Sequence, residues 1–276
     1  VSGRIINTEK LKWDLGVNIA AYRNKITKIS GDRMLSTYAG ANILTQVGLP
    51  VGMFYGYKTN GVYKSNAEAA TAGVSVQNAQ GDLIAQQGGD VRFVDVNNDH
   101  VINSSDMQVI GNPNPDYTGG ISTQLTYKRV SLDALFTFSK GNDIYNYTRR
   151  QLESESGFYN QSAAVLNRWR GDGQVTEIPR ASYGDPSGNS SFSDRWIEDG
   201  SYIRLRSVSV SYDIPFKYKF IKYIKVYATG SNLLTFTKYL GYDPEFAVNE
   251  NVLLQGIDTT LEPQFRTVQL GLRIGI

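Results

Sequence analysis

The chain has 276 residues, with 28 Lys or Arg against 26 Asp or Glu, which gives a formal net charge of +2. This balance, with the basic residues scattered along the chain, gives no electrostatic case for nucleic-acid binding. The absence of cysteine excludes a disulfide scaffold and thiolate metal sites. The first residues lack the apolar run of a signal peptide, and no segment approaches the ~18 apolar residues of a membrane helix.

Apolar residues recur at every second position in several segments, a pattern typical of strands with two unlike faces. Counted from a stub at residues 4–6, the pattern predicts about seven strands, which lie within 4–6, 12–22, 119–127, 131–139, 203–213, 222–233 and 267–276. The 27 Gly and 18 Tyr also favour sheets joined by polar turns. The apolar faces of the best-defined strands consist of Trp13, Leu15, Val17, Ile19, Ile121, Leu125, Tyr127, Leu132, Ala134, Phe136, Phe138, Val208, Val210, Tyr212, Val226, Ala228, Val268, Leu270, Leu272 and Ile274.

The opposite faces of these strands are polar, with Leu135 as an exception. The alternation within 203–206 is out of phase with the part of the strand that follows, which predicts a β-bulge there. The connections alternate in length along the chain. Short ones at 7–10, 128–129 and 214–221 separate long ones at 24–116, 141–200 and 237–263. Short turns on one side and long loops on the other are typical of an outer-membrane barrel.

The long loops contain helix signals of their own. A short helix is predicted at Asn66–Ala72 with Asn66 as its N-cap, and helical turns are predicted at 145–154 and 163–169. The loops are also rich in aromatic residues, which either pack the loops against one another or bind sugars or a protein partner. These aromatic residues are Phe54, Tyr55, Tyr57, Phe158, Tyr159, Trp169, Tyr183, Trp196, Tyr239 and Tyr242.

A stretch of twelve residues in the first long loop resembles a calcium-binding loop, which places oxygen ligands at positions 1, 3, 5, 7, 9 and 12. The corresponding residues are Asp95, Asn97, Asp99, the carbonyl of Val101, Asn103 and Asp106. His100 stands at the sixth position, where Gly is usual, and Asp106 replaces the usual Glu. The alternative is a surface turn held by Asx side chains that bond to the backbone. A structural Ca²⁺ and an Asx-rich turn therefore both remain open.

No set of catalytic residues stands out. The single histidine, His100, lies inside the acidic stretch, so any Ser-His pair would have to use it. Glu198 and Asp199 are adjacent, and adjacent side chains on a strand face opposite ways, so they cannot form a glycosidase pair. The sequence predicts that the protein is not an enzyme.

Several short motifs, in their order along the chain, resemble the SusC/RagA family of TonB-dependent outer-membrane transporters. The most specific is the run 89–116, which joins Gly89-Asp90-Val91, the acidic stretch and a Gly-Asn-Pro-Asn-Pro-Asp turn at 111–116. The other motifs are 12–14 with 24–26, 52–57 with 61–63, 139–145, Tyr202-Ile203-Arg204-Leu205, 231–235 and Tyr242-Asp243-Pro244-Glu245. Ile276 departs from the aromatic residue with which such barrels usually end.

The resemblance implies an all-β fold, with residues 1–276 forming the C-terminal ~7 antiparallel strands of a barrel of about 22 strands in the bacterial outer membrane. The plug and the N-terminal barrel strands would lie outside this chain. The implied function is uptake of an oligosaccharide or a peptide. The implied partners are a SusD-like surface lipoprotein, TonB through the missing N-terminal part, the remaining barrel and plug, and outer-membrane lipid.

A soluble calcium-dependent adhesin or carbohydrate-binding module is the alternative in the binding class. A barrel segment requires detergent after purification, whereas an adhesin does not, so detergent dependence separates the two. Substrate identity does not follow from the chain alone.

Overall fold

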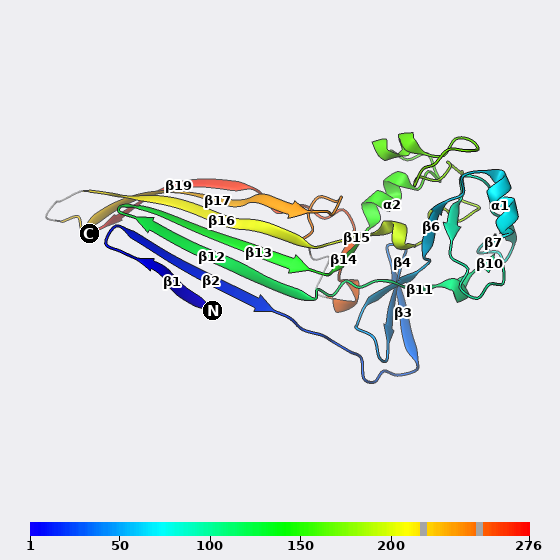
Figure 1. The fold of residues 1–276 in the computed structure, drawn as a ribbon, viewed down its shortest axis with the longest axis horizontal. Coiled ribbons are helices and arrows are strands. Elements are labelled where there is room, and N and C mark those ends of the chain that lie inside the picture. Colours follow the sequence, from blue (N-terminus) through cyan, green and yellow to red (C-terminus); the bar gives the residue numbers. More distant parts are fainter. Residues whose placement is uncertain (216–219, 247–250) are drawn as a thin grey trace.

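Seven long antiparallel strands from widely separated parts of the chain form one twisted sheet (Figure 1). The computed structural model describes residues 1–215, 220–246 and 251–276. The sheet has the order β1-β2-β12-β13-β16-β17-β19, so the expectation of about seven antiparallel strands is confirmed. The strands are β1 (Ser2–Asn7), β2 (Leu11–Ala20), β12 (Tyr117–Tyr127), β13 (Val130–Lys140), β16 (Tyr202–Ile214), β17 (Tyr223–Thr237) and β19 (Thr267–Gly275).

The connections between these strands alternate as the sequence predicts. Residues 8–10 and 128–129 make tight turns at one end of the sheet, and the strands that flank 215–222 meet at that same end (Figure 1). Residues 21–116, 141–201 and 238–266 connect the strands at the other end. The predicted connections at 214–221 and 237–263 are described only in part, because 216–219 and 247–250 lie outside the described residues. We call the structure formed by the three long connections the loop body.

The cross-strand register places the alternating residues as predicted. Ile121 of β12 pairs with Phe136 of β13 and with Val17 of β2, so the three side chains share one face. The predicted bulge is confirmed at Arg206, where the pairing between β13 and β16 steps from Ser207 to Leu205. The extra residue shifts the phase of β16, so that apolar side chains stay on one face along its whole length.

The loop body consists of small sheets rather than extended loops. In the part of the loop body that the structure describes, the sheets have the orders β11-β5-β4-β3, β10-β7-β8, β15-β14-β18 and β6-β9. The strands are β3 (Arg33–Tyr38), β4 (Ala41–Gln46), β5 (Met53–Gly56), β6 (Thr59–Val62), β7 (Ser75–Gln77), β8 (Leu83–Ala85), β9 (Val91–Phe93), β10 (Val101–Ile102), β11 (Gln108–Gly111), β14 (Asp143–Asn146), β15 (Ile197–Asp199) and β18 (Ile257–Asp258). Single helical turns lie between them at η1 (Ser104–Asp106), η2 (Ala163–Asn167), η3 (Asp194–Trp196) and η4 (Val252–Leu254).

Among its described residues, the loop body has two α-helices, α1 (Asn66–Ala72) and α2 (Tyr147–Glu153). Their positions agree with the sequence, but the predicted N-cap of α1 is wrong. Ser65, with extended backbone, is the cap, because its hydroxyl accepts a hydrogen bond from the Glu68 amide at 3.1 Å. Asn66 is the first helical residue, and its side chain instead accepts from the Gly88 amide.

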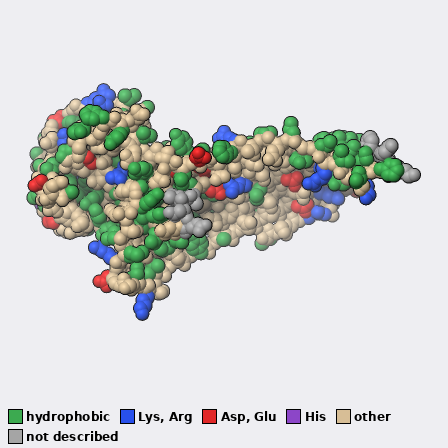
Figure 2. Space-filling model, turned by 180° about the vertical axis from the view of Figure 1, so that it is seen from behind, with side chains coloured by type: hydrophobic (Ala, Val, Ile, Leu, Met, Phe, Trp, Pro, Cys, Tyr) green, Lys and Arg blue, Asp and Glu red, His purple; other side chains and the backbone are tan. Residues whose placement is uncertain are grey.

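The buried hydrophobic side chains lie in the loop body and not in the seven-stranded sheet. One cluster gathers around Phe54, Tyr145 and Trp196, and a second around Val91 and Ile102. In the space-filling view from behind, the sheet is a long arm and the loop body is a broader mass (Figure 2). Within the described ranges, no helix is long and apolar enough to cross a membrane.

Candidate functional site

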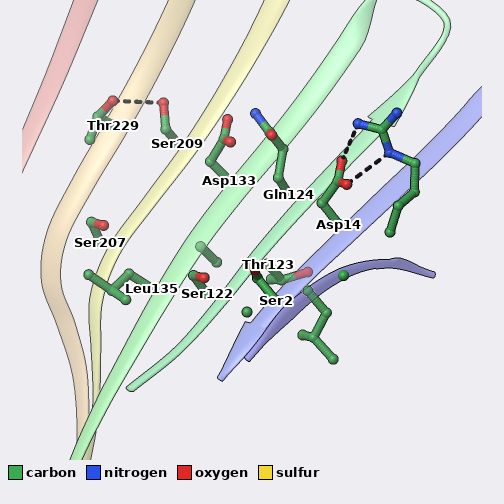
Figure 3. Close-up of a pocket in the computed structure, with 15 residues that line it drawn as sticks. Ser2, Asp14, Ser122, Thr123, Gln124, Asp133, Leu135, Ser207, Ser209 and Thr229 are labelled. Atoms are coloured by element: carbon green, nitrogen blue, oxygen red, sulfur yellow. Dashed lines mark hydrogen bonds and ion pairs between the residues drawn. The ribbon is translucent and has the colours of Figure 1, made fainter. Parts of the chain in front are cut away.

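One residue from each of the seven strands contributes to a polar row across one face of the sheet. Each is the direct cross-strand partner of the next, so all the side chains project to the same side. Figure 3 shows the middle of this row, from Asp14 to Thr229. We call it the polar row, and its members are Arg4, Asp14, Gln124, Asp133, Ser209, Thr229 and Gln269.

The polar row borders a hollow of about 570 Å³. The neighbouring row is built mainly of small residues, including Ser122 and Ser207, and Leu135 lies among them, as its position in the alternation predicts. A side chain at Gly16 would place its Cβ 2.6 Å from the Ser122 hydroxyl, so Gly16 leaves the space that this hydroxyl occupies. Small residues therefore create the hollow.

The polar groups that border the hollow pair only in part with each other. Arg4 donates to both carboxylate oxygens of Asp14, at 2.9 and 3.3 Å, and the hydroxyls of Ser209 and Thr229 lie 2.9 Å apart. Among the residues drawn in Figure 3, none donates a hydrogen bond to the carboxylate of Asp133, so its oxygens keep acceptor capacity on this side of the sheet. This face suits water or a polar protein surface.

A second group of charges lies where the polar face meets the loop body. Arg204 of β16 is buried, and it pairs with Asp243 and, at 3.1 Å, with Glu245. Arg206 also pairs with Glu245, at 3.0 Å. Asp243 accepts in addition from the Gln264 amide at 2.9 Å. The group therefore fastens both ends of the third long connection to the polar face of the sheet.

The opposite face of the sheet is apolar and exposed. Leu270 and Val268 of β19 are 84% and 73% exposed, and the face continues through Ile121 and Val210. The indole of Trp13, a polar group on this face, donates to the Thr123 hydroxyl at 2.8 Å, so the strands satisfy it themselves.

Aromatic residues flank the aliphatic band of the apolar face at both ends. Tyr127 and Tyr212 lie beside the short turns, whereas Tyr117, Phe138 and Phe236 lie toward the loop body. An apolar band between two aromatic girdles is the outer surface of a transmembrane β-barrel.

The acidic stretch forms a tight loop whose side chains bind its own backbone. Asp95 accepts from the amides of Asn98 and His100 at 2.7 and 2.8 Å, and Asp99 accepts from Val101 at 2.8 Å. His100 has a φ of 62°, as expected for the position that Gly usually takes. Val101 and Ile102 form β10.

Asp106 and Asn103 close the far end of this loop. The carboxylate of Asp106 is fully buried and accepts from the amides of Val96 and Asn103 at 2.8 and 2.9 Å, while Asn103 caps η1. Asn97 donates to Asp99 at 2.8 Å. Among the described residues, no three acidic or histidine side chains gather in a metal-binding arrangement. Each carboxylate oxygen that accepts one hydrogen bond still has a second lone pair.

The aromatic residues of the loops differ in burial, and Tyr55, Tyr57 and Trp169 are intermediate. Phe54, Trp196 and Tyr239 are buried, so packing accounts for them. In contrast, Phe158 and Tyr183 are exposed, although their rings lie 5.1 Å apart, and Tyr242 is also exposed. The sequence leaves both roles open because a burial pattern in irregular loops has no fixed period.

Buried charged groups form ion pairs in the loop body, and one pair joins the first long connection to the second. Arg180 donates to Asp90 at 2.7 and 3.2 Å, and the fully buried Asp90 also accepts from Asn189 at 3.0 Å. Burial raises the pKa of Glu155 to about 6, although Arg168, at 3.5 Å, acts in the opposite direction. The sequence analysis missed these pairs and the Arg204 group. The sequence offered one signal for the pairing of Arg204 with Asp243. Each of the two residues lies in one of the short motifs that resemble the family.

Comparison with known proteins gives similarity over nearly the whole chain. The chain is 32% identical over 293 residues to TonB-dependent receptor P3 of Formosa agariphila, covering 99% of this chain and 28% of that protein. It is 26% identical over 289 residues to TonB-dependent receptor SusC of Bacteroides thetaiotaomicron, covering 99% of this chain and 25% of that protein. The chain thus spans about a quarter of the length of these curated relatives. No protein-family model matches it.

Solved structures share the fold. The RagAB peptide importer in its closed-closed state matches with a TM-score of 0.75 at 23% identity, over 99% of this chain and 28% of the matched one. Its open-open state matches with a TM-score of 0.74 at 22% identity. The arrangement of the sheet and loop body is therefore one that occurs in a known importer.

Proposed function

Because this chain is a segment of a SusC/RagA-like TonB-dependent transporter of the outer membrane, we propose that the complete protein imports a nutrient across that membrane. The observation that carries the proposal is the pair of unlike faces on the seven-stranded sheet. The apolar face between aromatic girdles suits lipid, and the polar row suits the interior of a barrel. Transport needs no chemistry on the substrate, which agrees with relatives named as receptors and importers.

The edge strands β1 and β19 each pair with one neighbour in this sheet. In lipid an open edge leaves backbone groups without hydrogen bonds, so further strands of the same protein would pair with both edges. We propose that the sheet is one wall of a barrel of about 22 strands. The polar row would then face the plug.

The proposed partners follow from the family. A SusD-like surface lipoprotein would cover the loop body, and TonB would act through a part of the protein outside this chain. The substrate would be an oligosaccharide or a peptide, and the structural relatives named as a peptide importer support the second class as well.

Uptake by intact cells tests the function. A strain that lacks the complete protein should lose energy-dependent uptake of a labelled oligosaccharide or peptide, and a protonophore should abolish that uptake in the parent strain. Unchanged uptake of every nutrient class in the deletion strain would refute the proposal.

The orientation of the chain is tested separately. All three long connections lie at one end of the sheet, and we propose that this end faces the cell exterior. An epitope inserted beside the exposed Tyr183 should bind antibody on intact cells. Binding only after the outer membrane has been opened would reverse the topology.

A structural Ca²⁺ at Asp95, Asn97, Asp99, Val101, Asn103 and Asp106 remains a prediction. Carboxylates gathered in one short loop repel each other unless a cation or backbone amides offset their charge. If a cation binds, Ca²⁺ should protect the 95–106 segment of the complete transporter from proteolysis, and the double variant Asp95→Ala, Asp99→Ala should lose that protection. Equal cleavage with and without Ca²⁺ would leave only the turn held by Asx side chains.

A further inference from the structure

A cavity of about 310 Å³ opens in the loop body beside α2. One wall is formed by Arg149, Leu152 and Glu153 of α2, and the other by Leu240 and Tyr242 at the start of the third long connection. Its volume lies at the lower end of the range of small-molecule sites, roughly 300 to 1,000 Å³.

The cavity lies next to the polar face of the sheet. Tyr242 lines it and also lines a second hollow, which Arg204 and Thr235 border from β16 and β17. The pair of Arg204 with the adjacent Asp243 fixes the position of this segment. The cavity therefore adjoins the end of the polar face that meets the loop body.

Two of the polar groups in the walls already have their partners. Asn146 caps α2 by accepting from the Arg149 amide at 2.9 Å, and its side-chain amino group donates to Glu198 at 3.2 Å. Asp258 accepts from the Tyr239 hydroxyl at 2.5 Å and from the Thr260 amide at 2.9 Å. Asn146 and Asp258 therefore stabilise the cavity walls, and a ligand would have to bind other side chains.

Arg149 and Glu153 retain free hydrogen-bonding capacity. Nε of Arg149 lies 3.2 Å from Glu198, and its guanidinium lies over the Trp196 ring at 5.5 Å, which fixes its plane. Within the described parts of the chain, its two terminal amino groups donate no hydrogen bond. Glu153 accepts from Ser162 at 3.3 Å through one oxygen, and its other oxygen lies 4.0 Å from Nε of Arg149. Paired donors therefore stand beside a carboxylate acceptor.

An aromatic ring completes the set of groups in the cavity walls that can contact a ligand, after the Arg149 donors and the Glu153 acceptor. The side chain of Tyr242 is 72% exposed, and ordering an exposed ring against a ligand gains apolar contact without disturbing the fold. Charge narrows the ligand class further. Arg149, Glu153 and Asp258 line the cavity, and Glu198 pairs with Arg149 from behind it. The guanidinium of Arg195 lies over the same Trp196 ring at 4.7 Å. Three carboxylates therefore stand beside two guanidinium groups among the described residues, and this balance opposes an additional negative charge.

We propose that this cavity binds one or two rings of a neutral oligosaccharide. Adjacent hydroxyls of a sugar both donate and accept, so they match the Arg149 donors and the Glu153 acceptor, while the Tyr242 ring covers the apolar face of the sugar ring. The inference rests on the proposed import function and narrows its substrate class. It excludes uronic-acid oligosaccharides and acidic peptides at this site.

Calorimetric titration of the complete transporter in detergent tests the site. The probes are neutral pentasaccharides of glucose, xylose and mannose, a galacturonic acid pentasaccharide and a mixed pentapeptide. Tyr242→Ala should weaken binding of the preferred neutral sugar about 5- to 10-fold, whereas Tyr242→Phe should bind like the parent. Glu153→Gln should weaken it about 10-fold or more, because a charged acceptor is lost. Tyr159→Ala removes a tyrosine of the loop body that is as exposed and should change affinity less than twofold.

Failure of this inference and failure of the import function give different results. If no neutral pentasaccharide binds, if the anionic sugar or the peptide binds better, or if Tyr242→Ala and Tyr159→Ala act alike, the cavity is not a sugar site. Uptake of some nutrient would then still support import. Failure of the proposed import function would instead appear as unchanged nutrient uptake in the deletion strain.

Discussion

The seven-stranded sheet and the loop body use their apolar residues in opposite ways. In the loop body, Trp196 and Tyr145 are fully buried by their neighbours, whereas in the sheet Leu270 and Val268 are largely exposed. The loop body thus has a core of the kind that folds in water. The sheet has an apolar face that its own chain leaves exposed, so its stability depends on the lipid of the outer membrane.

Polar groups show the same contrast. The loop body buries charged groups, such as Asp90 with Arg180, and supplies hydrogen bonds for them from its own chain. The sheet places its polar row on the face opposite the apolar one, where Asp133, Gln124 and Ser209 border an open hollow. Substitutions in the two regions should therefore have different effects, since those in the loop body should destabilise only the loop body and those in the sheet should destabilise the barrel.

The largest effect is expected in the core of the loop body. Trp196→Ala removes a fully buried ring and should destabilise the loop body by about 3–5 kcal/mol. Protease cleavage of the long connections in outer-membrane vesicles measures this, while the heat-modifiable barrel band should persist on gels. Phe158→Ala, at a ring that is 94% exposed, is the control and should cost less than ~0.5 kcal/mol. Loss of the barrel band in Trp196→Ala would mean that the two regions fold as one.

The next effect is expected on the apolar face of the sheet. Phe136 lies near the middle of β13, and Phe136→Arg should cost about 2–4 kcal/mol in barrel stability, because a charge at mid-bilayer depth is poorly solvated. The fraction of heat-modifiable barrel in titrations with urea measures it. Gln124→Arg, on the polar face, should be tolerated. Equal damage from both substitutions would contradict the assignment of the two faces.

A smaller effect should depend on pH and stay within the loop body. Burial raises the pKa of Glu155 from 4.5 to about 6, against the attraction of Arg168, so folding takes up a proton between these values. The contribution of Glu155 therefore favours the fold below pH 4.5 and is lost as the pH rises through 6, by about 1–2 kcal/mol.

Protease sensitivity of the loop body at pH 4.5 and pH 7.5 measures this contribution. Glu155→Gln, which stays neutral, should remove the difference that the carboxyl causes between the two pH values. A loop body with the same pH dependence in the variant and the parent would exclude Glu155 as its source.

The smallest effect is expected at the start of α1. Ser65→Ala removes the capping hydroxyl and should destabilise the helix by about 1 kcal/mol. Ser65→Asp keeps an acceptor at the cap and should retain most of the stability. Hydrogen exchange at the Glu68 amide, which Ser65 accepts from, measures the change locally. An unchanged exchange rate in Ser65→Ala would contradict this cap.

The sequence by itself determined the sheet. Alternation is a local property, since successive side chains of a strand point to opposite faces, and so it gave the number of strands, their two faces and the bulge at Arg206. The alternation of short and long connections along the chain also predicted that the short ones lie at one end of the sheet and the long ones at the other. The family resemblance rested on short motifs in order, which the similarity to SusC bears out.

Only the tertiary structure decided the organisation of the long connections. Their small sheets, the burial of Trp196 but not of Tyr242, and the pairing of Arg204 with Asp243 join residues far apart along the chain. No local periodicity of the sequence encodes such pairings, because the conformation of an irregular segment depends on contacts with residues far away along the chain. The choice of Ser65 over Asn66 as the cap has the same cause, since Asn66 is engaged with the distant Gly88 amide.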